Sequence, residues 1–360
     1  MEHNPQKDRG LDGLRVYAGI GIIMWHVFAN ATYDLSGYFF ESVLPTFSRL
    51  AYLFMVISGY SMCCGYFHKI TNREITVGEF YGRRYAKIFP FFAVLCLAEF
   101  ALAPTLVGLY EVIANLTLCF GFLPLHNTSI IGVGWFLGVL FVFYFIFPFF
   151  CYLMEKKWRG WLAFGLSWVL SYLCRIYFFT KPYMGITIYG GKLSKMNFLY
   201  CAPFFLAGGI LFLYRDKLKW FVRKFWYLVL LLCGGAVTLL YTVKVEYAYE
   251  VAIPTFMCLV TYAIGVKWKG VLHNPVTKFL GQMSLELYLC HMAAFRILEL
   301  MGLLHIFQSP LMSFIATVLF TLILSIGITY AIRGGFWLLK KGWEYLKAKR
   351  TKQKETIQEE

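Results

Sequence analysis

Long apolar stretches recur along almost the whole chain, from residue 14 to residue 332. A helix needs roughly 20 predominantly apolar residues to cross a bilayer core about 30 Å thick. Only 15% of the 360 residues are charged and 59% are hydrophobic, whereas a soluble protein carries about 25% charged residues. The sequence therefore predicts an all-α, polytopic bundle of transmembrane helices and excludes an ordinary soluble enzyme.

The basic residues are concentrated in the joints between apolar stretches, and alternate joints are poor in Lys and Arg. The positive-inside rule places basic joints in the cytoplasm, which both termini share if the number of spans is even. The net charge of +15 then reflects topology, and no nucleic-acid partner is expected. We predict ten spans, at residues 14–33, 45–66, 86–104, 134–154, 161–179, 197–214, 225–243, 249–266, 279–301 and 311–332.

One apolar segment, residues 105–124, does not fit this count. An eleventh span there would move the basic joint at Lys156, Lys157 and Arg159 to the outer side, so we expect a peripheral or re-entrant segment. The ten Cys mostly lie in apolar stretches without metal-ligand spacing, so no metal site is predicted. The domain division is a membrane domain over residues 1–335 and a basic cytoplasmic tail over residues 336–360.

Ionisable residues within spans are candidates for function, and the first span contains the richest set. Asp12, Arg15, Gly19, Ile22 and His26 are separated by 3, 4, 3 and 4 residues, so they share one helical face. His26 lies roughly 16 Å beyond Arg15 along the helix, and the glycine between them leaves space for a slender ligand. The alternative is structural: an interfacial ion pair, and a histidine that binds a neighbouring helix.

A tight basic cluster lies at the predicted cytoplasmic start of the third span. Arg83, Arg84 and Lys87 fall within five residues, and the last two share a helical face. Such cations anchor a helix to anionic lipid headgroups. They are equally suited to the phosphates of a soluble nucleotide carrier, since Arg presents forked donors.

A polar stripe lies near the end of the chain. Ser284, Tyr288 and His291 are spaced by 4 and 3 residues on one helical face. A stripe of this kind serves helix packing more often than catalysis.

Weaker candidates lie on the second and fourth predicted spans. Trp135 and Tyr144 belong to the fourth, and Ser58-Gly59 on the second suits close approach of helices. Glu99 and Glu250 lie near predicted outer helix ends, and we assign them no role.

Five segments, in this order, resemble the motifs of the acyltransferase-3 family of integral-membrane acyltransferases, over residues 10–332. They are Leu11-Asp12-Gly13-Leu14-Arg15 with His26, Phe54 to Tyr60, Phe80 to Pro90, Trp135 to Pro148, and Gly281 to His291. Two positions depart from the family pattern: Lys87 stands where Arg is usual, and Leu140 where many members carry Glu. The fourth segment looks more like the branch that modifies surface polysaccharides.

The resemblance implies O-acylation, usually acetylation, of a sugar hydroxyl on a cell-surface glycan or its lipid-linked precursor. The donor would be cytoplasmic acetyl-CoA, used as a co-substrate and not held permanently. The expected location is a bacterial plasma membrane, with lipid as a partner and an oligomer possible. The implied catalytic residues are His26, Arg15 and Asp12; the donor-binding residues Arg83, Arg84, Lys87, Ser58 and Gly59; the supporting residues Trp135, Tyr144, Ser284, Tyr288 and His291.

The spacing is compatible with a donor whose phosphates bind the basic cluster and whose arm follows the Gly19 face to His26. A neutral imidazole can accept the proton of a sugar hydroxyl, or it can carry the acyl group itself. Ser284 or Tyr288 is a candidate donor to the thioester oxygen. The rival functional class is a glycan exporter or flippase without acyl transfer. A receptor or channel is disfavoured, because the sequence contains no repeat and no ring of charges typical of a pore.

Overall fold

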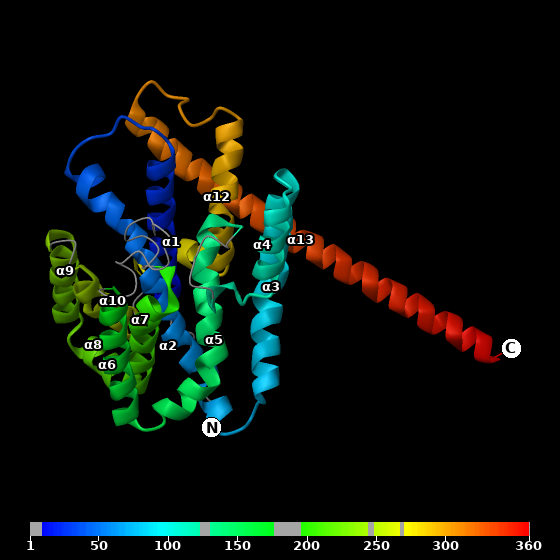
Figure 1. The fold of residues 1–360 in the computed structure, drawn as a ribbon, viewed down its shortest axis with the longest axis horizontal. Coiled ribbons are helices and arrows are strands. Elements are labelled where there is room, and N and C mark those ends of the chain that lie inside the picture. The colour runs from blue at the N-terminus through cyan, green and yellow to red at the C-terminus, as the bar shows by residue number, and fades with distance from the viewer. Residues whose placement is uncertain (1–8, 123–129, 176–195, 244–247, 267–269, 360) are drawn as a thin grey trace.

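The computed structural model describes residues 9–122, 130–175, 196–243, 248–266 and 270–359, with side chains up to residue 347. Regular structure in these ranges is helical throughout (Figure 1). The α-helices are α1 (Arg9–Asn30), α2 (Leu50–Thr71), α3 (Val77–Leu102), α4 (Leu106–Leu116), α5 (Trp135–Met154), α6 (Lys157–Leu173), α7 (Phe198–Leu213), α8 (Arg215–Lys224), α9 (Trp226–Thr242), α10 (Ala248–Gly265), α11 (Pro275–Gly281), α12 (Ser284–Leu300) and α13 (Pro310–Glu359).

Among the described residues, five helical stretches are long and apolar enough to cross a membrane, and α7 with α8 makes a sixth if that pair, bent by 75°, is one span. The five are Phe39–Thr71, Val77–Leu102, Gly132–Met154, Ala248–Gly265 and Pro310–Lys347. The prediction of an all-helical chain with several membrane spans is thus confirmed. The count of ten and the side of each terminus stay predictions.

Three predicted spans have different limits in the structure. The third begins at Val77 and not at residue 86, because Thr76 and Glu79 form a capping box, which satisfies free N–H groups at a helix start. The ninth, predicted over 279–301, is divided between α11 and α12 by Gln282 and Met283. The tenth does not end at residue 332, since α13 continues to Glu359 and leaves the bundle (Figure 1).

The apolar segment that did not fit the predicted span count, described up to residue 122, folds back against α3. Its helix α4 has 11 residues, about 16 Å of rise, which is too short to cross a bilayer core. The Tyr85 hydroxyl donates to the Leu116 carbonyl at 2.6 Å, and the rings of Phe92 and Phe120 stack 6.2 Å apart. The described part of this segment, residues 105–122, therefore packs along α3, and its helix is too short to span the membrane by itself.

Helix α1 lies inside the bundle and is held close to its neighbours by glycines. A Cβ on Gly10 would lie 2.1 Å from the Ala263 carbonyl oxygen, and one on Gly13 would lie 2.1 Å from that of Leu272. Small residues at such positions let backbones approach and pack. The face of α1 that carries the predicted functional residues is consequently enclosed by α2, α11, α12 and α13.

Candidate active site

Two histidines from opposite ends of the chain meet inside the bundle. His26 Nδ1 of α1 lies 2.7 Å from His291 Nε2 of α12, and the two rings stack with centroids 4.9 Å apart. His291 is 1% exposed, and its Nδ1 lies 2.6 Å from the Tyr288 carbonyl oxygen. The two polar stripes recognised separately in the sequence therefore form one site.

The partners of these rings determine where their protons lie. A carbonyl oxygen only accepts, so His291 Nδ1 carries a proton and donates it to Tyr288. In a neutral imidazole the other nitrogen is an acceptor, so His291 Nε2 accepts from a proton on His26 Nδ1. Neutral His26 then has an unprotonated Nε2, and its lone pair is available to a substrate.

Arg15 is fixed at the other end of the same helix face. Its guanidinium donates to the Asp12 carboxylate at 3.0 Å and to the Ser61 hydroxyl of α2 at 2.6 Å. Gly281 packs against Asp12, and a Cβ there would approach the aspartate Cβ to 2.8 Å. The predicted pair of Asp12 and Arg15 is present, and it links α1 with α2 and α11.

The basic cluster is divided by the structure. The Arg84 guanidinium lies 4.3 Å from the Tyr66 ring centroid and 5.8 Å from that of Tyr144. Lys87 lies close enough to Arg84, Arg15 and Glu286 for their charges to interact. Arg84, Lys87 and Arg15 together form what we call the cationic entrance.

Arg83 does not share in this arrangement. It is exposed, and its charge interacts with that of Glu79, one turn earlier on α3. Adjacent residues of a helix point about 100° apart, which explains why Arg84 faces the bundle and Arg83 does not.

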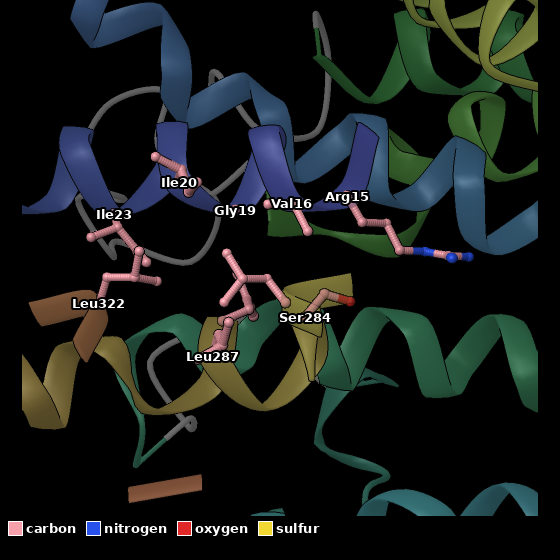
Figure 2. Close-up of a pocket in the computed structure, with 10 residues that line it drawn as sticks. Arg15, Val16, Gly19, Ile20, Ile23, Ser284, Leu287 and Leu322 are labelled. Carbon is pink, nitrogen blue, oxygen red and sulfur yellow. The ribbon is translucent and has the colours of Figure 1, made fainter. Parts of the chain in front are cut away.

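A narrow apolar groove follows α1 from the cationic entrance toward the histidines. Figure 2 shows it between α1 and α12, with Arg15 at one end and Leu322 of α13 beside Ile23 at the other. Gly19 leaves its middle open, since the nearest atom to a Cβ there is a Phe54 ring carbon at 4.0 Å. The lining residues are Arg15, Val16, Gly19, Ile20, Ile23, Leu280, Ser284, Leu287, Tyr288 and Leu322.

The groove approaches the imidazole pair at its apolar end. Ile23 precedes His26 by three residues on the same face of α1. Tyr288 lines the groove, and its ring centroid lies 5.9 Å from that of His291. Two residues of the face predicted from spacing, Arg15 and Gly19, therefore line a groove that starts at one cation of the entrance and ends one helical turn before His26.

The supporting residues have distinct positions. The Tyr288 hydroxyl donates to the Val133 carbonyl at 3.1 Å, so its proton is not free for a thioester oxygen. Ser284 lines the groove near Arg15. The Trp135 ring is buried and contacts the rings of Phe136 and Tyr52.

Ser58-Gly59 lies at a crossing of two helices. A Cβ on Gly59 would lie 2.1 Å from the Phe205 carbonyl oxygen, and Gly208 of α7 faces it. The residue of this turn that contacts the site is Ser61, the partner of Arg15, which the sequence analysis did not select. Tyr66, under Arg84, was also missed, although both residues follow the Ser-Gly element on one helix.

Metal ligation is not a feature of the described ranges, since no group of three or more His, Cys, Asp or Glu side chains gathers there. His26 and His291 bind each other and their near neighbours. The chemistry available at the site is that of an imidazole pair, a groove and a cationic entrance.

Comparison with known proteins addresses the family of the chain. No curated protein and no solved structure matches it. The family model described as an acyltransferase domain matches residues 8–330, which include all five sequence motifs and every residue of the candidate site. The chain belongs to the acyltransferase-3 family of membrane acyltransferases.

Proposed function

We propose that this acyltransferase moves an acetyl group from cytoplasmic acetyl-CoA to a hydroxyl of a cell-surface glycan or its lipid-linked precursor. One observation supports the proposal: the groove of α1 has Arg15 at one end, where the charges of Lys87 and Arg84 interact with each other and that of Lys87 with Arg15, and it ends at Ile23, one helical turn before the imidazole pair. A donor with a polyanionic head, a thin arm and a reactive terminal carbon matches that order.

The cationic entrance suits the phosphates of the donor. Arg84 is held between two tyrosine rings and Arg15 between Asp12 and Ser61, so both guanidinium groups are oriented before a ligand arrives. Orientation in advance reduces the entropy lost on binding. Lys87 adds a compact charge without forked donors. On the predicted topology these cations face the cytoplasm, where acetyl-CoA is available.

The groove suits the arm of the donor. About 16 Å of helix rise separates Arg15 from His26 on α1, and the groove that covers most of this length has mostly aliphatic walls. An apolar passage excludes water from the thioester, which protects it from hydrolysis. Gly19 provides the width where a larger side chain would narrow the passage.

The imidazole pair supplies the base. His26 Nε2 takes the proton from the sugar hydroxyl while the oxygen attacks the thioester carbonyl carbon. The C–S bond then breaks, the acetyl group remains on the sugar oxygen, and the thiolate of CoA receives the proton from His26. His291 does not touch the reacting atoms; it holds the His26 ring and its tautomer.

Transfer of radiolabelled acetyl from acetyl-CoA to a glycan extract, by the purified protein in lipid nanodiscs, tests the proposal. We expect transfer by the wild type and none by His26→Ala, while the exposed His68→Ala control keeps full activity. Mass spectrometry of surface glycans from cells with and without the protein should show a difference of one acetyl group. Export of glycan without label transfer would instead identify a carrier.

A further inference from the structure

A second group of charged and aromatic residues lies at the end of α6 and the start of α10. Arg175 forms an ion pair with Glu250, and their side chains are 19% and 33% exposed. The guanidinium lies 4.2 Å from the Tyr249 ring centroid and 5.6 Å from that of Tyr172. On the predicted topology these are outer helix ends, on the side opposite to the cationic entrance.

A hydrogen-bonded network holds the aromatic base of this group. The Tyr249 hydroxyl donates to the Tyr200 carbonyl at 2.8 Å and therefore accepts from the Ser171 hydroxyl at 2.7 Å. Tyr200 and Tyr249 are each 5% exposed, whereas Tyr172 is 50% exposed. The charged pair thus rests on a fixed, buried floor beside one accessible ring.

Among the described residues, two buried atoms of the ion pair have no hydrogen-bond partner. They are Arg175 Nε, a donor, and Glu250 Oε2, an acceptor. Such atoms are rare in native proteins because an unpaired buried polar group costs free energy. The exposed parts of the two side chains, 19% and 33%, offer a donor and an acceptor to a ligand hydroxyl, which accepts one hydrogen bond and donates another.

A second arginine gives the group an unneutralised positive charge. Arg49, which directly precedes α2, is half-buried, and its charge acts on the hydroxyls of Tyr52 and Tyr200. Arg175 acts on Tyr200 as well. Within the parts of the chain that the structure describes, no carboxylate forms an ion pair with Arg49, whereas Glu250 pairs with Arg175.

We propose that Arg49, Arg175, Glu250 and Tyr172 form the binding site for an acidic saccharide, the acceptor of the reaction. Arg49 binds its carboxylate or phosphate, Arg175 and Glu250 bind hydroxyls, and the exposed Tyr172 ring packs on a sugar face. That the bound saccharide is the acceptor rests on the proposed function, whereas binding of the saccharide does not. A series of ring contacts connects it to the imidazole pair, through Tyr52, Trp135, Phe136, Tyr288 and His291.

Binding to the full-length purified protein, measured without acyl donor, tests the site independently of transfer. The probes are a glucuronate-containing tetrasaccharide and the same tetrasaccharide with its carboxyl groups reduced to alcohols. We expect the acidic probe to bind about tenfold more tightly, which corresponds to one charge-assisted contact. Arg49→Gln should remove that preference and Arg49→Lys should keep most of it.

Two further variants separate the site from general charge and from loss of fold. Glu250→Gln should weaken both probes, whereas Arg296→Gln, another arginine on a predicted outer helix end, should change neither. Equal affinity for the two probes, no affinity for either, or an unchanged preference in Arg49→Gln would overturn the site. Tight binding of the acidic probe without acetyl transfer would support the binding site and contradict the proposed reaction.

Discussion

The two histidines illustrate what residue spacing reveals and what it leaves out. Spacing placed His26 and His291 on polar faces of two separate helices, and both faces line the site. Their mutual hydrogen bond joins residues 265 positions apart, and spacing within one helix contains no information on which helices pack together. The roles of Ser61 and Tyr66 were likewise not recognisable, because the chain has 25 tyrosines and their partners lie on other helices.

Replacement of His291 should slow catalysis without weakening donor binding. His291→Ala removes the acceptor that holds the His26 proton on Nδ1, so the His26 ring is free to turn. We expect kcat to fall about 10–100-fold, as for partners that orient a functional histidine, with an unchanged KM for acetyl-CoA.

His291→Gln provides the matched control, since its amide oxygen can accept from His26 Nδ1. Partial recovery of kcat in this variant is expected from a positioning role. Equal loss in His291→Ala and His291→Gln would contradict that role.

Arg83 and Arg84 are adjacent in the sequence but differ in surroundings, so they form a natural pair of variants. Arg84→Ala should raise the KM for acetyl-CoA about tenfold, the effect of one charge-assisted contact. Arg83→Ala should leave that KM nearly unchanged, because Arg83 is exposed outside the cationic entrance. If both variants had the same KM for acetyl-CoA as the wild type, these cations would be interpreted as lipid anchors and not as donor-binding residues.

At the scale of helices, apolar stretches predicted where helices occur but not where several begin or end. The capping boxes at Thr76 and Asn274 start α3 and α11, and the span limits predicted from hydropathy overlooked both. As a result the basic cluster lies inside α3, two turns from its start. Hydropathy likewise did not reveal the break at Gln282 and Met283, which lets Gly281 approach Asp12.

The crossing of α2 with α7 depends on Gly59. In Gly59→Ala the new Cβ would lie 2.1 Å from the Phe205 carbonyl oxygen, so the helices must separate. Overpacking of this kind costs about 1–3 kcal/mol, and we expect a lower midpoint of thermal unfolding in detergent with an unchanged KM for the donor.

Gly65→Ala on the same helix is the control, because no atom lies within 4 Å of its added Cβ. It should raise stability slightly, since alanine favours a helix over glycine by about 1 kcal/mol. A raised donor KM with normal stability in Gly59→Ala would return Ser58-Gly59 to the donor site.

For the whole molecule, the distribution of basic residues predicts which helix ends face the cytoplasm, and the two proposed binding sites lie at opposite predicted sides. The cationic entrance lies at the ends of helices assigned to the cytoplasm, and the group around Arg175 lies at ends assigned to the outside. The hydropathy pattern could not establish the number of crossings, because α6, α7, α9 and α12 have 16 or 17 residues each, near the minimum for a span.

Epitope tags test this orientation. A tag after Glu360 should be inaccessible to antibody in intact cells and accessible after permeabilisation, whereas a tag inserted after Gly37 should be accessible in both. If both tags were accessible in intact cells, the number of crossings would be odd and the C-terminus would lie outside, which would contradict the predicted orientation.

The chain of hydrogen bonds from His26 through His291 ends on the neutral carbonyl of Tyr288. Within the described residues no carboxylate serves either ring as a counter-ion, unlike the familiar arrangement in which an aspartate supports a basic histidine. An imidazolium formed here would be an isolated charge in an apolar interior, which is costly to maintain. In the proposed reaction the proton would therefore leave His26 quickly for the departing sulfur, so that each turnover would release it as the thiol of free CoA.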